Sequence, residues 1–138
     1  MATAPDWIPQ AAALPVKAGQ ICLVTSSSGK RWVIPKGMME PGKTAGEIAL
    51  QEAWEEAGLT GVLVGEPIGT YQYDKYGGTC LVTVFLMRVT SVAVEWPENG
   101  LRQRCWVSPA QALGLIEERG LREIIRGTLP DGGARRRA

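Results

Sequence analysis

One apolar run, from Cys80 to Val89, limits more than any other segment what this chain can fold into. It has the length of a strand, it is rich in β-branched and other apolar residues, and only Thr83 and Arg88 interrupt it. A run of this kind predicts a strand at the centre of a sheet. Because the whole chain has 138 residues, one domain of ordinary size can be built around that strand.

Shorter apolar segments on either side predict the rest of the sheet and the helices. Turn residues bound them, such as Ser26 to Lys30 after the first segment and Asp74 to Gly78 before the central run. Mixed strands with one early and one late helical region indicate an α/β (α+β) layered domain. The expected strands are residues 20–25, 31–34, 62–64, 68–73 and 104–107, and the expected helices are 45–57 and 109–118, the latter continuing over 121–126.

The two ends of the chain differ in composition from the middle. Residues 1–17 are rich in alanine and proline, which predicts an irregular N-terminal arm before a domain spanning 18–127. Residues 128–138 end in three consecutive arginines, Arg135 to Arg137, and predict a disordered basic tail. We therefore expect one folded domain between two irregular ends.

The early helix has clear start and stop signals. Thr44 is a suitable N-cap, and Glu47 three residues later completes a capping-box pattern. Gly58 is placed for the left-handed turn that ends many helices. The residues expected to form the packing face are Ala45, Ile48, Ala49, Ala53 and Trp54.

The chain has no histidine, which excludes several kinds of catalysis. Ser-His-Asp and Cys-His nucleophilic catalysis, histidine zinc sites and imidazole acid–base chemistry all need that residue. Cys22, Cys80 and Cys105 are far apart and lie in apolar runs, so we expect buried free thiols rather than a zinc site. Catalysis must then use carboxylates, hydroxyls, amines, thiols or a metal bound by carboxylates.

Three glutamates gather in the last turns of the predicted helix 45–57. Glu52, Glu55 and Glu56 share one face, and no Lys or Arg stands at helical spacing to neutralise them. Like charges and the negative end of the helix dipole each disfavour this arrangement by about a few tenths of a kcal/mol. A hard divalent cation would reverse that balance, and Mg²⁺ prefers carboxylate oxygens. Solvated surface glutamates are the simpler alternative.

The loop before this helix favours a metal site over solvated glutamates. Arg31 and Lys36 are suitable partners for phosphate, and Gly37 lets a ligand approach the backbone closely. Cations beside an acidic metal site are what a polyphosphate substrate requires. The sequence therefore predicts a magnesium–phosphate site formed by the loop and the helix.

From residue 37 to residue 59 the chain resembles the Nudix box, G-x5-E-x7-R-E-U-x-E-E-x-G-U, in which U is aliphatic. The resemblance implies a Nudix-type α/β/α sandwich with a mixed sheet and the Nudix loop-helix-loop. It extends from about Ala18 to Ile125, and segments 95–97 and 102–106 are similar to the diphosphoinositol polyphosphate phosphohydrolase-like branch. The residues that match the box, with its spacing intact, are Gly37, Glu52, Glu55, Glu56, Gly58 and Leu59.

The resemblance also implies an activity, the Mg²⁺-dependent hydrolysis of a phosphoanhydride bond in a nucleoside diphosphate-linked or diphosphoinositol polyphosphate-type substrate, with Mn²⁺ as an alternative metal. By position, Glu52 and Glu56 are expected to bind the metal together with the backbone carbonyl of Lys36. Glu55 is expected to be a third metal ligand or the general base. Six residues are expected to bind substrate, with a solvated surface role as the alternative for the last three: Arg31, Lys36, Gly37, Lys75, Arg102 and Arg104.

Three tyrosines follow the box. Tyr71, Tyr73 and Tyr76 stand at distances where dinucleoside polyphosphate hydrolases carry a base-stacking tyrosine. Core or strand-pairing roles are the alternative that we favour at this point.

Two positions depart from the box. Lys43 stands where the box has glutamate, and Gln51 stands where it has arginine. In the family that arginine is generally taken to orient the acidic cluster, with the glutamate as its ionic partner, so both members of a supporting pair are altered here. We expect a working but slow site, and the alternative is a catalytically weakened Nudix-fold sensor that binds a nucleotide or polyphosphate.

Charge and hydropathy limit the partners. A formal net charge of +1 and the absence of an RNA-binding aromatic motif both argue against nucleic acid. No apolar stretch approaches the ~20 residues of a membrane span, and no secretory signal is visible. We expect a cytoplasmic protein, monomeric or homodimeric, that acts on a small-molecule polyphosphate or nucleotide.

Overall fold

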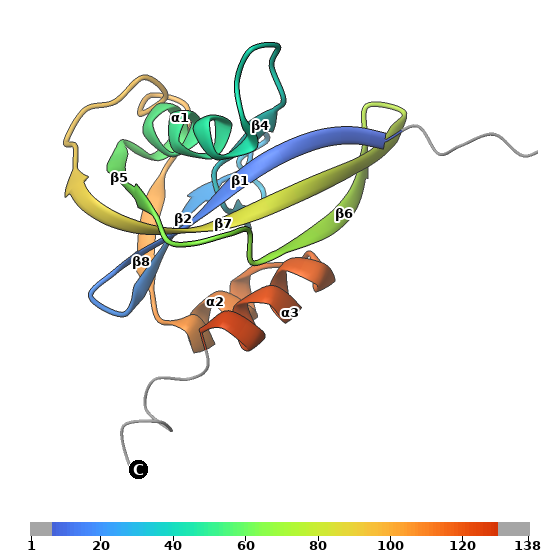
Figure 1. The fold of residues 1–138 in the computed structure, drawn as a ribbon. Helices are drawn as coiled ribbons and strands as arrows, with labels where there is room; N and C mark the ends of the chain where they lie inside the picture. Colours follow the sequence, from blue (N-terminus) through green and yellow to red (C-terminus); the bar gives the residue numbers. More distant parts are fainter. Residues whose placement is uncertain (1–6, 130–138) are drawn as a thin grey trace, which may run out of the picture.

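The computed structural model describes residues 7–129, and Figure 1 shows a mixed sheet with α1 on one face and α2 and α3 on the other. The expected α/β/α sandwich with a mixed sheet is therefore confirmed. The elements are β1 (Trp7–Lys17), β2 (Gln20–Thr25), β3 (Trp32–Val33), β4 (Lys36–Met38), α1 (Ala45–Ala57), β5 (Leu59–Leu63), β6 (Gly69–Lys75), β7 (Gly78–Val92), β8 (Arg104–Val107), α2 (Pro109–Leu115) and α3 (Arg119–Thr128).

The long strands β1 and β7 form the centre of the sheet. They pair in parallel from Trp7 opposite Thr79 to Val16 opposite Arg88. On its other side β1 pairs antiparallel with β4 and β2, and β7 pairs antiparallel with β5 and β6. The prediction of a central strand over residues 80–89 is confirmed, and β1 is its partner.

The prediction of an irregular arm is wrong for residues 7–17. The middle of β1, from Ala11 to Leu14, has no exposed surface because both faces of the sheet are covered there. Alanine and proline have a low intrinsic preference for strands, which is why the sequence pattern indicates an arm. Pro9 and Pro15 lie outside the stretches of β1 that pair with β4 and β2. Packing on both faces therefore outweighs local preference.

The predicted ends of the chain are described only in part. Residues 1–6 of the expected arm and residues 130–138 of the expected tail lie outside the described residues. Thr128, the first residue of that tail, belongs to α3.

Helix α1 begins and ends where the sequence predicts. Thr44 and Glu47 form both hydrogen bonds of a capping box, and Gly58 adopts the left-handed conformation with φ of 68°. Its packing face differs from the prediction, because Trp54 is 41% exposed while two glutamates and Ala57 are buried. The buried residues of α1 are Ile48, Ala49, Glu52, Ala53, Glu56 and Ala57.

The late helical region also differs from its prediction. Helix α2 begins after its N-cap, Ser108, as expected, but it ends at Leu115 instead of continuing to Glu118. Ile116 has extended backbone and is buried in the core between the sheet and the helices α2 and α3. Residues 116–118 therefore form the connection that leads from α2 to α3. None of the helices in the part of the chain that the structure describes is long and apolar enough to cross a membrane.

The position of β1 in the core predicts a large cost for truncating one of its side chains. Leu14→Ala is expected to lower the free energy of unfolding by about 3 kcal/mol, because Leu14 is fully buried and its removal leaves a cavity. Leu101→Ala is the matched control, since Leu101 is 78% exposed and its loss should cost less than about 0.5 kcal/mol. Urea denaturation measures both values, and equal values would contradict the central placement of β1.

Candidate active site

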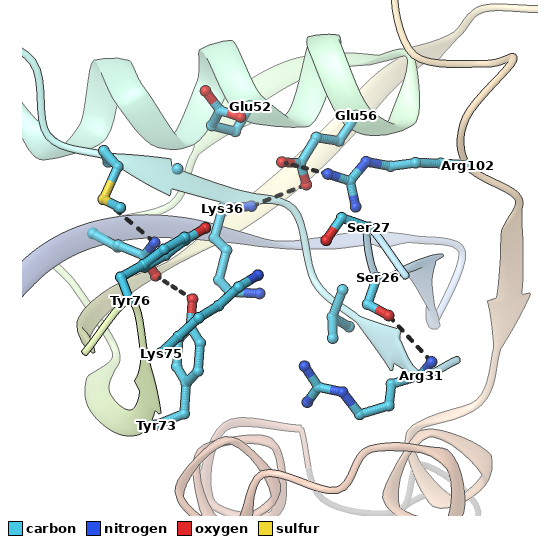
Figure 2. Close-up of a pocket in the computed structure, with 14 residues that line it drawn as sticks. Ser26, Ser27, Arg31, Lys36, Glu52, Glu56, Tyr73, Lys75, Tyr76 and Arg102 are labelled. Atoms are coloured by element: carbon cyan, nitrogen blue, oxygen red, sulfur yellow. Dashed lines mark hydrogen bonds and ion pairs between the residues drawn. The ribbon is translucent and has the colours of Figure 1, made fainter. Parts of the chain in front are cut away.

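A cavity of about 270 Å³ lies between the C-terminal half of α1, β4, the turn after β2 and the tip of the β6–β7 hairpin (Figure 2). Carboxylates, cations and hydroxyls all line it. Its residues are Gln10, Ser26, Ser27, Arg31, Val33, Lys36, Gly37, Met38, Glu52, Glu56, Tyr73, Lys75, Tyr76 and Arg102.

Two carboxylates stand on adjacent turns of α1 at one side of this cavity. Glu52 is 9% exposed and Glu56 is 7% exposed, although both carry side chains that normally stay in water. The backbone N–H of Lys36 donates a hydrogen bond to Oε1 of Glu56 at 3.3 Å. A Cβ on Gly37 would stand 2.5 Å from Cδ of Glu52, so a larger residue there would displace the Glu52 carboxylate from its present position.

Arg102 supports Glu56 from the loop after β7. Its Nη2 lies 3.3 Å from Oε2 of Glu56, while its Nε and Nη1 donate to Glu98 and to the backbone carbonyl of Thr25. The side chain is only 14% exposed. The guanidinium lines the cavity, as a substrate-binding residue would, but three protein acceptors already engage it.

Burial controls the protonation of these groups. It raises the pKa of Glu52, and it raises the pKa of Glu56 to about 8, against the opposing charge of Arg102. Burial lowers the pKa of Lys36 in the same cavity. Burial thus disfavours the charged form of each group, so a cation beside the glutamates and an anion beside the lysine would each favour that form.

The carboxylate pair fits a magnesium ion. Mg²⁺ in proteins commonly takes about one or two carboxylates and keeps several waters for exchange with substrate phosphates. Within residues 7–129 no group of three or more His, Cys, Asp or Glu side chains forms a metal cluster, so Glu52 and Glu56 would hold the ion with main-chain oxygens, water or substrate. The expected contribution of the Lys36 carbonyl remains a prediction.

Three cations line the cavity away from the two glutamates. Arg31 lies across the cavity from α1 (Figure 2). The Nζ of Lys36 stands 5.1 Å from the ring centre of Tyr73, and that of Lys75 stands 5.0 Å from the ring centre of Tyr76, both suitable for cation–π interaction.

The three tyrosines divide between core and cavity. Tyr71 is buried in the core beneath the sheet, as expected. Tyr73 and Tyr76 line the cavity, where the hydroxyl of Tyr73 donates to Oε1 of Gln10 at 2.7 Å.

Two of the predicted site residues lie outside the cavity. Glu55 is half-buried and is absent from the lining, although it stands between Glu52 and Glu56 in the sequence. Arg104 donates instead to the backbone carbonyls of Ala57 and Ala93, the former at 2.7 Å. Its guanidinium also stacks 4.1 Å from the ring centre of Trp96. Arg104 therefore caps the C-terminal end of α1. It does not line the cavity, so the structure does not place it where the predicted substrate would bind.

The two departures from the box contact each other. Nζ of Lys43 donates to Oε1 of Gln51, and Nε2 of Gln51 donates to Oε2 of Glu40 at 3.1 Å. Lys43 also pairs with Glu40 at 3.5 Å. Hydrogen bonds of Gln51 to Lys43 and Glu40 thus hold the loop before α1 against the helix.

Several residues of this region have no clear signal in the sequence. Gln10 is one of the polar residues in what resembles an irregular arm, and Ser26 and Ser27 have the pattern of an ordinary turn. Glu118, which pairs with Arg31 at 2.6 Å, is 87 residues away in the chain. Only tertiary structure brings these groups to the cavity.

The comparisons with known proteins agree with the fold. A family model described as the NUDIX domain matches residues 8–129. The chain belongs to the Nudix family. The match includes β1, which places that strand inside the family domain.

Named relatives include plant and animal proteins. The chain is 33% identical over 119 residues to Nudix hydrolase 12, mitochondrial, of Arabidopsis thaliana. The alignment covers 78% of this chain and 59% of that protein. It is 30% identical over 101 residues to diphosphoinositol polyphosphate phosphohydrolase 3-alpha of Homo sapiens, with 71% of this chain and 60% of that protein covered. The chain thus spans less than two thirds of the length of these relatives.

Solved structures show the same fold at lower identity. A Caenorhabditis elegans Ap4A hydrolase superposes with a TM-score of 0.70 at 20% identity, covering 86% of this chain and 93% of that one. A Nudix hydrolase from Nitrosomonas europaea superposes with a TM-score of 0.72 at 19% identity, covering 86% of each chain.

The placement of Arg104 predicts an effect on stability. Arg104→Ala is expected to lower the free energy of unfolding by about 2 kcal/mol, because two carbonyls lose a charged donor. Arg88→Ala removes the same charge from an exposed position and should cost less than about 0.5 kcal/mol. Thermal or urea unfolding compares the two variants, and an unchanged stability of Arg104→Ala would argue against the cap.

Proposed function

We propose that this chain hydrolyses a phosphoanhydride bond, with Mg²⁺ as the metal and Mn²⁺ as an alternative. The observation that carries the proposal is the single cavity in which two buried carboxylates, Glu52 and Glu56, face Arg31, Lys36 and Lys75. The family and the names of its relatives support hydrolysis as the reaction.

One side of the cavity would bind the metal and the other would bind the phosphate chain. Glu52 and Glu56 would hold the metal, which when bound supplies charge stabilisation at phosphate oxygens and a reactive water. Lys36 and Arg31 would orient the phosphate chain and offset the charge that develops on it. Gly37 leaves room for the Glu52 carboxylate beside β4. Glu55 is retained as the candidate for a third ligand or the general base.

The cations favour a highly anionic substrate. Arg31, Lys36 and Lys75 exceed what a single phosphate needs, and the backbone around Gly37 adds room for close approach. We therefore place the substrate among the diphosphoinositol polyphosphates and the nucleoside diphosphate-linked or dinucleoside polyphosphates. Tyr73 and Tyr76 at the cavity would serve the second class by stacking on a base.

A reducing compartment such as the cytoplasm is proposed as the location. Cys22 and Cys80 are buried free thiols, and Cys105 is partly buried and also free. Several plant relatives bear names that place them in mitochondria or chloroplasts, so fractionation of the native cells is the direct test.

The test of the reaction is a panel of phosphoanhydrides assayed with Mg²⁺. The parent is expected to turn over at least one member, whereas Glu52→Gln and Glu56→Gln should each lose more than about 100-fold in kcat/KM, because a neutral amide is a poor Mg²⁺ ligand. Glu66→Gln makes the same chemical change at an exposed position and should behave as the parent. No turnover of any member, or full activity in Glu56→Gln, would overturn the proposal.

The alternative of a weakened sensor can be tested at the two departures from the box. Lys43→Glu combined with Gln51→Arg rebuilds the box. The two departures predict a slow site from sequence, but in the structure Lys43 and Gln51, with Glu40, still connect the loop to α1. We therefore expect the double variant to change kcat/KM by less than about threefold. Each single variant should be less stable than the double variant, since it leaves like charges together. A large gain in activity in the double variant would instead favour the sensor.

A further inference from the structure

A partly buried ion pair joins the cavity to the loop between α2 and α3. Nη1 of Arg31 lies 2.6 Å from Oε2 of Glu118. Arg31 lines the cavity just before β3, while Glu118 precedes α3 on the far side of the sheet from α1. The pair therefore links a cavity cation to the layer of helices beneath the sheet.

The two members of the pair differ in exposure. The side chain of Glu118 is 6% exposed, whereas that of Arg31 is 33% exposed. The second oxygen of Glu118, Oε1, is buried and has no hydrogen-bond partner among the described residues. A carboxylate in this setting is strongly stabilised by one nearby guanidinium, because separating the two would leave a buried charge alone. Glu118 thus restricts Arg31 to one side of the cavity.

The remaining donors of Arg31 are available to a ligand. Among the described residues the guanidinium has hydrogen bonds only through Nη1, to Glu118. The other nitrogens can therefore donate to an anion in the cavity.

We propose that Glu118 is a positioning residue that holds the Arg31 guanidinium in place for a phosphate group of the substrate, across the cavity from Glu52 and Glu56. The inference rests on the proposed function for its substrate, but it concerns a residue outside the Nudix box. A fixed guanidinium loses less conformational entropy on binding than a free one, so the pair strengthens phosphate binding without touching the ligand.

The test measures binding separately from turnover. Methylenediphosphonate with Mg²⁺ is the probe, because its P–C–P bridge cannot be hydrolysed, and isothermal titration calorimetry gives its Kd. Glu118→Ala is expected to weaken binding about tenfold, whereas Glu118→Gln keeps an acceptor for Arg31 and should stay within about threefold. Glu117→Ala is the matched control, since Glu117 is exposed and should leave Kd unchanged.

A double-mutant cycle separates positioning from a general loss of structure. In an Arg31→Ala background Glu118→Ala should cause no further loss of affinity, because the residue that it positions is gone. In the steady-state assay Glu118→Ala should raise KM with kcat changed less than about threefold. Glu118→Met fills the buried space without charge and replaces Glu118→Ala if that variant does not fold.

Three results would overturn the proposal. They are unchanged binding in a folded Glu118→Ala or Glu118→Met variant, an equal loss with and without Arg31, or a fall in kcat alone. If the parent protein binds the probe but hydrolyses no substrate, the proposed hydrolysis is wrong. The double-mutant cycle still decides whether Glu118 positions Arg31.

Discussion

The burial of two carboxylates on one helix is the constraint around which this site is arranged. Glu52 and Glu56 lose most of their hydration, and their charges repel each other, so the surrounding structure must compensate. The Lys36 N–H and Arg102 compensate Glu56 in part, and a divalent cation would complete the balance. Two charged carboxylates are thus unfavourable here, and either a bound proton or a cation relieves them.

Local rules make the helix and its acids predictable from sequence. The capping box at Thr44, the stop at Gly58 and the spacing of Glu52 and Glu56 depend on residues within a few positions of one another, and the structure has all three features. The central strand is predictable for a similar reason, because a continuous apolar run has few alternatives in a folded domain. The resemblance to the Nudix box then gives the fold, which the strand order alone does not determine.

The parts that could not be predicted depend on distant residues. β1 is a strand because β4, β2 and β7 pair with it, while its own alanines and prolines favour no strand. Arg102 and Arg104 stand two positions apart, yet one supports Glu56 and the other caps α1, and the sequence does not distinguish them. Glu118 contacts the cavity cation Arg31 directly, although 87 residues separate the two in the chain. The sequence is enough to identify the acidic residues of the site. Which basic residues lie beside them depends on tertiary contacts.

The parallel pairing of β1 with β7 has a consequence for how the domain forms. Trp7 pairs with Thr79 and Val16 with Arg88, so about half of the chain separates the two strands that hold the sheet together. Contacts of such long range close late and slowly, because the intervening loop must first lose its freedom. β4 carries Lys36 and Gly37 and is held to the sheet by β1. The chain therefore has to be synthesised past residue 88 before β4 can be set against the glutamates, so the acidic residues of α1 leave the ribosome before the strand that completes their cavity.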